Sequence, residues 1–457
     1  MFKRKRLFAL LMALAMMLTL LSGCGGKDSG KKNDEEFDDW PVTIKVWVCN
    51  TGNGYEYLQS TASAFNAQQD KYIIDLSYAG SYQDVLLKMR TSTEGSRPDI
   101  FHADTESMYA ILEQSDIYVP IQQYVDADNY DMSTMMDNLE VTYTQNGEWQ
   151  CMPLGNTVTG FFYNADALAK CGIDPRTDLN SYEDILAACR KLKANGYSTP
   201  FYLHTSSAFY TFPMTAQGIQ YVDNNNGKDG TPTRTLIGDV GSAANQATVS
   251  FFNTIMTMAD EGLMMPFGTT VSDARAAFTN GEMVFFTEFI SSFNTINTAV
   301  GGAFEMGFHE SPTIEAGTTN HGQCTGGGSL FLANNGDKIK EQGAWEFMKF
   351  LMQDEHTAGF AEASGYLPTT TTGYETAQYQ NFVSTTFPTA KYSLEAQQAT
   401  DETCYNAWLP MFSDFHALCR EFYTKAYNRS ASAEDLTQSF AKAFNEVIEL
   451  YLMSTGK

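Results

Sequence analysis

The sequence has few basic residues and no cysteine pair with metal-binding spacing. Its 457 residues include 54 acidic and 29 basic side chains, for a formal net charge of −25. Such an acidic chain repels phosphate backbones, which argues against nucleic acid as a partner. The eight cysteines contain no C-x-x-C spacing, so nothing supports a zinc site, and we expect no metal or other cofactor.

Long apolar runs are missing beyond the N-terminus. Lys3–Arg6 is basic, Leu7–Leu21 is apolar but too short to span a bilayer comfortably, and Leu21–Cys24 reads LSGC. This resembles a bacterial lipoprotein signal, which implies cleavage before a lipidated Cys24. Gly25–Asp39 has almost no apolar side chains and is expected to be a flexible tether. We therefore predict a signal peptide at 1–24, a tether at 25–39, and a lipid anchor to the extracellular side of the cell membrane.

Several enzyme signatures are also absent. The sequence has no G-x-S-x-G, H-E-x-x-H or G-x-x-x-x-G-K-[ST] pattern. A glycosidase needs only two carboxylates at a suitable separation, so a secreted glycosidase remains an alternative. A surface adhesin or structural lipoprotein is a third.

Strand and helix patterns alternate after the tether, which predicts an α/β domain with a largely parallel sheet. The expected strands are Val42–Val48, Tyr72–Tyr78 and one beginning near Arg97, and the expected helices are Tyr57–Gln69 and Tyr82–Thr91. Ligands of such sheets lie beyond the carboxyl ends of the strands. We therefore expect one binding edge formed by Asn50–Tyr55, Gly80–Tyr82 and Ala103–Glu106.

The most informative stretch is Cys324–Pro368. A glycine-rich strand, CTGGGSLFL, precedes an expected helix at about Lys338–Gln353 and a second helix from about Asp354, which Gly365 and Pro368 end. The helices should bury a broad apolar face formed by Ala344, Trp345, Phe347, Met348, Phe350 and Leu351.

Together these features resemble the sugar-type extracellular solute-binding proteins of bacterial ABC importers, which include maltose, multiple-sugar and glycerol-phosphate binders. The matching segments are Trp40–Phe101, Trp149–Asn164, Phe278–Met283, Phe304–Phe308 and Gly326–Pro368. The resemblance implies a two-lobed periplasmic-binding-protein-like α/β fold, each lobe a mostly parallel sheet flanked by helices, with hinge crossings. It places lobe 1 at 40–155 and 310–365, and lobe 2 at 156–309 and 366–457.

The same resemblance implies a monomeric binder, not an enzyme, that delivers its ligand to a membrane permease. Sugars present hydroxyls, which pair with polar side chains, and C–H faces, which aromatic rings cover. The resemblance and this chemistry together give the candidate ligand residues, which are Trp47, Tyr82, Asp104, Glu106, Asn156, Thr157, His204, Gly326, Gly327, Gly328, Tyr366 and Trp408.

The charge of the ligand follows from missing cations. The candidate site segments contain no Lys or Arg, whereas a buried phosphate needs cationic compensation. This favours a neutral saccharide. Glycerol phosphate or a related phosphodiester remains the alternative, because the amides of Gly326–Gly328 could form an anion nest.

Two further predictions are structural. Tyr221–Thr235 is polar and rich in Gly and Asn, so we expect a surface excursion. Ser181 and Asp184 have the spacing of a capping box. Seven cysteines remain after Cys24, which leaves one or two disulfides open.

Overall fold

The computed structural model describes residues 39–113 and 116–457. The predicted signal peptide, Cys24 and nearly all of the tether lie outside the described residues. Pro41–Lys457 forms one unit. Among the helices of the described residues, none combines the length and apolar character needed to cross a membrane.

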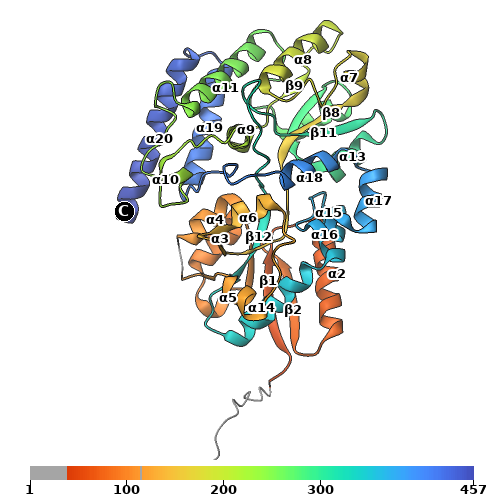
Figure 1. Ribbon diagram of the computed structural model, residues 1–457, viewed down its shortest axis with the longest axis vertical. Coiled ribbons are helices and arrows are strands. Elements are labelled where there is room, and N and C mark those ends of the chain that lie inside the picture. The colour runs from red at the N-terminus through yellow and green to blue at the C-terminus, as the bar shows by residue number, and fades with distance from the viewer. Residues whose placement is uncertain (1–38, 114–115) are drawn as a thin grey trace, which may run out of the picture. The chain divides into compact units, whose positions relative to one another are not determined.

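The strands form two larger sheets and a two-stranded hairpin (Figure 1). The first sheet has the order β2-β1-β3-β12-β4, with β7 also paired to β12. Its strands are β1 (Val42–Val48), β2 (Tyr72–Tyr78), β3 (Ile100–Asp104), β4 (Tyr118–Val119), β7 (Met152–Pro153) and β12 (Gly328–Ala333). The second sheet has the order β11-β8-β10-β9, formed by β8 (Thr159–Asn164), β9 (Phe201–Tyr202), β10 (Phe285–Phe289) and β11 (Met306–Glu310). The hairpin pairs β5 (Thr144–Gln145) with β6 (Glu148–Trp149).

Helices surround both sheets. In the first part of the chain they are α2 (Gly52–Gln68), α3 (Tyr82–Thr91), η1 (Glu94–Ser96), α4 (Thr105–Leu112), α5 (Gln122–Asp128) and α6 (Asp137–Tyr143). The middle part contains α7 (Ala165–Lys170), α8 (Tyr182–Ala194), α9 (Ala208–Ala216), α10 (Asp223–Asn226), α11 (Ala243–Asp260), α12 (Val271–Thr279), η2 (Ile290–Ser292) and α13 (Phe293–Val300). The last part contains α14 (Lys338–Leu351), α15 (Asp354–Ser364), α16 (Thr371–Glu375), α17 (Ala377–Thr385), α18 (Ala390–Gln398), α19 (Phe412–Tyr427) and α20 (Ala433–Thr455).

The first sheet begins as the sequence predicts. In β1 the buried side chains are Ile44, Val46 and Val48, because alternate residues of a strand face the same side. β1 pairs in parallel with β2 and β3, while β12 runs antiparallel to β3. The carboxyl ends of β1 and β3 therefore meet at one edge, where the loop after β1 and the start of α4 lie.

The second sheet differs from the expectation of a mostly parallel sheet. β8 pairs antiparallel with both β10 and β11, and only β9 and β10 pair in parallel. Neighbouring strands in this sheet are mostly separated by several helices along the chain. The handedness and direction that a short strand–helix–strand unit imposes therefore do not apply to them.

Three segments connect the two sheets and lie side by side. The first is the stretch between β7 and β8, in which the Leu154 amide donates to the Gly328 carbonyl. The second precedes β12, where the Gly326 amide donates to the Thr157 carbonyl. The third follows α15, where the Leu367 amide donates to the Asn156 carbonyl. These backbone hydrogen bonds join residues far apart in the sequence into one crossing point.

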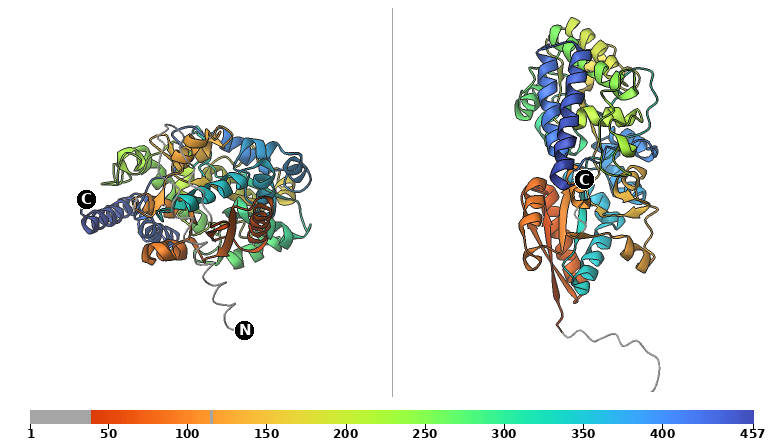
Figure 2. Two further views of the ribbon diagram at one scale, coloured as in Figure 1. Left: turned by 90° about the horizontal axis from the view of Figure 1, so that it is seen from below. Right: turned by 90° about the vertical axis from the view of Figure 1, so that its left-hand side faces the viewer.

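The C-terminal helices show the predicted caps and apolar faces. α14 buries all six predicted apolar residues, and α15 ends at Gly365, whose φ of 82° is the left-handed conformation that favours glycine. The predicted capping box between Ser181 and Asp184 is also present. α16 and α17 pack on α15, whereas α19 and α20 lie side by side against α11, as Figures 1 and 2 show.

Candidate ligand-binding site

A pocket of about 580 Å³ opens where β1 ends. One wall comes from the loop after β1, the first turn of α3 and the end of α15, and the other comes from η2 and α13. The lining residues are Cys49, Asn50, Thr51, Gly52, Asn53, Gly54, Tyr82, Ser291, Asn294, Thr295, Thr298, Ala363, Ser364 and Tyr366. Within the described part of the chain, none of these lining residues is a Lys, Arg, Asp or Glu, so the pocket offers amides, hydroxyls and two phenol rings.

The two tyrosines are held by each other and by their neighbours. The phenol groups of Tyr82 and Tyr366 hydrogen-bond, and the ring of Tyr366 stacks on Phe360 with centroids 5.9 Å apart. Any Cβ at Gly155 would lie only 2.8 Å from the Tyr366 ring, so glycine there lets the ring approach the backbone. Burial raises the pKa of both phenols, which therefore stay neutral at physiological pH.

His102 lies behind Tyr82 and was not predicted. The two rings meet edge to face with centroids 5.0 Å apart, and His102 Nδ1 accepts from the Cys49 amide at 3.3 Å. Burial lowers the pKa of His102 to about 3, so the imidazole is neutral. The sequence marks His102 only as a polar residue inside a strand, which gives no hint that it supports the pocket.

Asp104 and Glu106 lie at the end of β3, at the predicted edge. Asp104 caps α4 by accepting from the Ser107 amide at 2.8 Å, and Glu106 follows in the first turn. Burial raises the pKa of both carboxyls, and the charge of Asp104 adds to the rise at Glu106. Neither carboxylate forms a salt bridge with another described residue. A ligand hydroxyl could therefore donate to either group.

Trp408 lies at a second contact between distant segments. Its ring is 5% exposed and lies 5.2 Å from the ring of Tyr109, which is in α4 near Glu106. The indole Nε1–H of Trp408 is buried without a hydrogen-bond partner among the described residues. A buried indole donor normally has an acceptor, so this atom is a candidate ligand contact.

Lys228 lies beside Trp408 in the segment Tyr221–Thr235, which was expected to be a surface excursion. Parts of this segment are buried, so the expectation is wrong for those parts. The Lys228 Nζ donates to the Val141 carbonyl of α6 at 2.6 Å, and lies 4.2 Å from the ring centre of Tyr405 and 5.9 Å from that of Trp408. Burial lowers the pKa of Lys228 to about 8. Tyr221, Val222 and Asn226 are buried in the same segment, because side chains distant in sequence cover them. No apolar periodicity in this polar stretch could have revealed the lysine.

Asn156 and Thr157 are placed in the crossing point, away from the pocket lining. Asn156 is 0% exposed, and its amide bonds to the Pro368 carbonyl and the side chains of Gln397 and Asn138. Thr157 is also buried, and its hydroxyl accepts from the Ser291 amide at 3.4 Å. The Asn156 side chain therefore joins two crossing segments, and the Thr157 hydroxyl joins the crossing point to η2.

The three glycines also pack closely against neighbouring backbone and side chains. The Gly326 amide donates to Thr157 and the Gly327 amide to the Thr325 hydroxyl, so both donors are already used within the chain. A Cβ at Gly327 would lie 1.6 Å from the Gly155 carbonyl oxygen, and one at Gly328 would lie 2.1 Å from His102. Any larger side chain would clash at these two positions, so close packing accounts for the glycines there.

Trp47 and His204 do not line the pocket with Tyr82 and Tyr366. Trp47 lies in β1 with Lys88 Nζ 5.8 Å from its ring centre. His204 follows β9, accepts from the Ser206 amide at 2.9 Å and packs against Phe209 with centroids 4.9 Å apart. Burial lowers the pKa of His204 to about 4, so its ring is neutral.

The pocket includes part of the expected edge and also a wall that the sequence did not suggest. The loop after β1 and Tyr82 line the pocket as predicted. Ser291, Asn294, Thr295 and Thr298 come from η2 and α13, where the sequence shows only an ordinary polar helix face. Asn294 donates to the carbonyls of Glu362 and Ala363, which fixes this wall to the end of α15.

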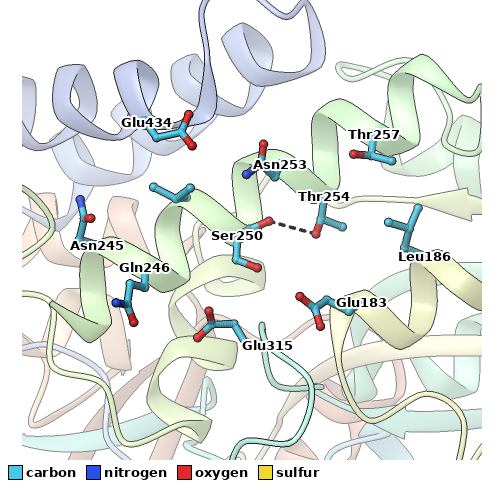
Figure 3. Close-up of a pocket in the computed structure, with 11 residues that line it drawn as sticks. Glu183, Leu186, Asn245, Gln246, Ser250, Asn253, Thr254, Thr257, Glu315 and Glu434 are labelled. Atoms are coloured by element: carbon cyan, nitrogen blue, oxygen red, sulfur yellow. Dashed lines mark hydrogen bonds between the residues drawn. The ribbon is translucent and has the colours of Figure 1, made fainter. Parts of the chain in front are cut away.

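A separate pocket of about 520 Å³ lies between α8 and α11 and contains none of the predicted ligand residues. Glu183, Glu315 and Glu434 surround it together with Asn, Gln, Ser and Thr side chains of α11 (Figure 3). The Glu183 carboxylate accepts from the Ala316 amide at 3.3 Å, so it already holds the adjacent loop. Three carboxylates alone do not define a ligand.

Similarity to known proteins agrees with this arrangement. The sequence profile of bacterial extracellular solute-binding proteins matches residues 60–385. The chain belongs to this family. The sn-glycerol-3-phosphate-binding periplasmic protein UgpB of Brucella melitensis is 26% identical over 348 residues, covering 74% of this chain and 76% of that protein. The corresponding protein of Yersinia pestis is 25% identical over 354 residues, with the same coverage.

Solved structures of lower identity show the same fold. The sugar-binding protein MalE of Xanthomonas citri has a TM-score of 0.73 at 15% identity, covering 91% of this chain and all of that one. UgpB of Mycobacterium tuberculosis, solved with glycerophosphocholine, has a TM-score of 0.70 at 17% identity, covering 90% and 99%. The two sheets are thus the cores of the lobes of a periplasmic-binding-protein fold, and the chain is a solute-binding protein of the ABC-importer type.

Proposed function

We propose that this solute-binding protein captures a neutral saccharide between its lobes and delivers it to the permease of an ABC importer. The observation that carries the proposal is the pocket at the end of β1, whose described lining is polar, uncharged and contains two tyrosines. Amide and hydroxyl groups match the hydroxyls of a sugar, and phenol rings match its C–H faces. Solved relatives include the sugar-binding protein MalE and a binder of cyclic alpha-maltosyl-1,6-maltose from Arthrobacter globiformis, with a TM-score of 0.71 at 18% identity.

A ligand screen tests this assignment. A ligand that binds only the folded protein raises its melting temperature, so neutral mono- and oligosaccharides can be compared by thermal shift and confirmed by calorimetry. We expect saturable binding that changes little between low and high salt, since a neutral ligand has no charge to screen. Steep salt dependence, or preference for glycerol phosphate over every sugar, would contradict the neutral-ligand assignment.

A phosphate-bearing ligand is the second candidate, and Lys228 favours it. Lys228 supplies a half-buried cation that the candidate segments lacked, and the unpartnered Nε1–H of Trp408 lies in the neighbouring ring. Several relatives are named for glycerol-phosphate binding, and one was solved with glycerophosphocholine. Buried cations compensate phosphate charge, so Lys228→Gln should abolish binding of a phosphodiester and spare binding of a neutral sugar.

The matched control for Lys228→Gln is Lys442→Gln. The Lys442 side chain is 80% exposed in α20 and forms a long ion pair of 3.9 Å with Glu446. If both variants bind glycerophosphocholine with the affinity of the unaltered protein, Lys228 does not contribute to phosphate binding. If neither glycerophosphocholine nor glycerol phosphate binds the unaltered protein, this candidate is excluded.

The lobes are inferred to close on the ligand by bending at the crossing point. We assign 40–155 and 310–365 to one lobe, and 156–309 and 366–457 to the other. Support comes from the three side-by-side crossing segments and from pocket walls contributed by both halves. Hinge closure is the usual motion of such proteins.

Two further parts of the proposal concern the setting of the protein. We infer a monomer held at the extracellular side of the membrane by a lipid on Cys24, supported by the LSGC signal. We also infer binding without turnover, because the relatives are named as binding proteins. Release of products from an oligosaccharide would instead indicate the glycosidase alternative, and absence of both binding and turnover would indicate an adhesin.

A further inference from the structure

Two cysteines far apart in the sequence lie together in a small, buried apolar cluster. Cys324, in the crossing segment before β12, is 2% exposed, and Cys404, four residues before Trp408, is 1% exposed. They form one apolar cluster with Ala208 and Phe212 of α9. The thiol of Cys324 lies 3.2 Å from the Thr215 hydroxyl, at the end of the same helix.

The two thiols also interact directly. The Cys324 thiol and its backbone amide both act on the Cys404 thiol, and the net effect together with burial is a raised pKa of Cys404. In the structure all seven cysteines after Cys24 are thiols. The other five pack separately within the described part of the chain, for example Cys189 in the apolar face of α8 and Cys419 in that of α19. The buried ones have the surroundings of small hydrophobic residues, whereas Cys49 is half-buried and lines the pocket at the end of β1.

The protein belongs to an extracellular family, so the two neighbouring thiols are exposed to oxidising conditions. Thiols outside the reducing cytosol meet disulfides and oxidants that can convert an adjacent pair to a disulfide. A disulfide inside a buried cluster is also protected from reduction once formed, because exchange needs access of an attacking thiolate. The neighbouring Cys324 thiol and burial raise the pKa of Cys404, which keeps Cys404 unreactive in the folded, reduced protein.

We propose that Cys324 and Cys404 form a disulfide in the exported protein, joining the segment that carries Gly326–Gly328 to the segment that carries Trp408. The oxidant is a low-molecular-weight or enzyme-bound disulfide. One cysteine thiolate displaces one sulfur of that disulfide to form a mixed disulfide and releases one thiol. The second cysteine then displaces the other sulfur, which leaves one protein disulfide and two reduced thiols in total. Because burial hinders this exchange, it occurs during folding or transient opening.

The bond would close a loop of about 80 residues that contains β12 and α14 through α18. In the chain-entropy view, a loop of that length can shift the unfolding equilibrium by on the order of a thousandfold. The oxidised protein should therefore melt several degrees higher than the reduced protein. Five cysteines that stay free provide an internal control, since they should alkylate in both states.

The test is peptide mapping of the purified protein. The protein is refolded with a mixture of reduced and oxidised glutathione, denatured with N-ethylmaleimide, digested without reductant and analysed by mass spectrometry. We expect a cross-linked peptide pair that contains Cys324 and Cys404, lighter by two hydrogens than the separate peptides, with the other five cysteines alkylated. Complete alkylation of all seven, or bridging of a different pair, overturns the proposal.

Cysteine variants distinguish the Cys324–Cys404 disulfide from oxidation at other cysteines. Cys324→Ser and Cys404→Ser should each lose the cross-linked peptide and the difference in melting temperature between oxidised and reduced protein. Cys189→Ala, which alters an isolated buried thiol, should keep both. A redox-dependent melting temperature that persists in Cys404→Ser would also contradict the assignment. If the serine variants fail to fold, the peptide map of the unaltered protein still decides the question.

Discussion

Replacement of Tyr366 by alanine should remove the central aromatic contact of the pocket. Its ring lines the pocket beside Tyr82, stacks on Phe360 at 5.9 Å and touches the backbone at Gly155. Aromatic anchors at the centre of a binding site cost about 2 kcal/mol or more when truncated, which corresponds to roughly thirtyfold in affinity. We therefore expect Tyr366→Ala to weaken saccharide binding by at least this factor.

The fold should survive the same change. Truncation of a fully buried aromatic ring costs about 3 kcal/mol or more in stability, and the cost here is smaller because the Tyr366 ring is only half-buried and faces a pocket. Tyr366→Phe keeps the stacked ring and loses the phenol that bonds to Tyr82. That bond lies within the protein in both the free and the bound state and is worth about 1 kcal/mol, so this variant should lose about that much stability and keep most of the affinity.

Titration calorimetry with the saccharide found in the screen measures both effects, and circular dichroism with thermal melts reports folding. Tyr78→Ala is the matched control, because Tyr78 in β2 is 52% exposed and does not line the pocket. Unchanged affinity in a folded Tyr366→Ala protein would remove Tyr366 from the site. An equal loss in Tyr78→Ala would show that the effect does not come from the pocket.

Four further outcomes are expected. A saturating ligand should reduce the radius of gyration in small-angle scattering, and confirmed binding without compaction would argue against hinge closure. Cys24→Ala should prevent lipid attachment, and mass spectrometry of membrane fractions would refute the anchor if the unaltered mature chain began elsewhere. Asn156→Ala should lower the free energy of unfolding by about 2 kcal/mol or more in urea titrations, because it leaves buried polar groups at the crossing point without hydrogen-bond partners. The control Asn195→Ala, at the exposed end of α8, should lower the free energy of unfolding less. Burial lowers the folded-state pKa of Lys228 to about 8, below its pKa in the unfolded chain. The buried charge therefore costs stability below pH 8, and this cost disappears as the pH rises toward the unfolded-state pKa. The gain in stability from Lys228→Gln should accordingly be greatest below pH 8 and shrink above it.

Local patterns in the sequence determined much of the scaffold. Alternating buried residues specified β1, a 3.6-residue period specified the buried face of α14, and Gly365 specified where α15 ends. These features depend on residues close together in the chain, so their spacing is visible without tertiary contacts. The edge of the first sheet after β1 could also be predicted, because the strands are recognisable from local patterns and parallel strands bring their carboxyl ends together.

Only the tertiary structure decided which side chains meet there. Ser291 reaches the pocket from η2 and Asn294 from α13, Lys228 is half-buried between Val141 and Tyr405, and Cys324 meets Cys404. Each of these pairings joins segments separated by dozens of residues or more, and no local periodicity encodes them. The antiparallel second sheet has the same origin, since its neighbouring strands are mostly brought together by packing rather than by a short connection. Asn156 shows the limit most clearly, because its polar side chain suggested a ligand contact, whereas in the fold it bonds to Pro368 in another crossing segment and to Gln397 of α18.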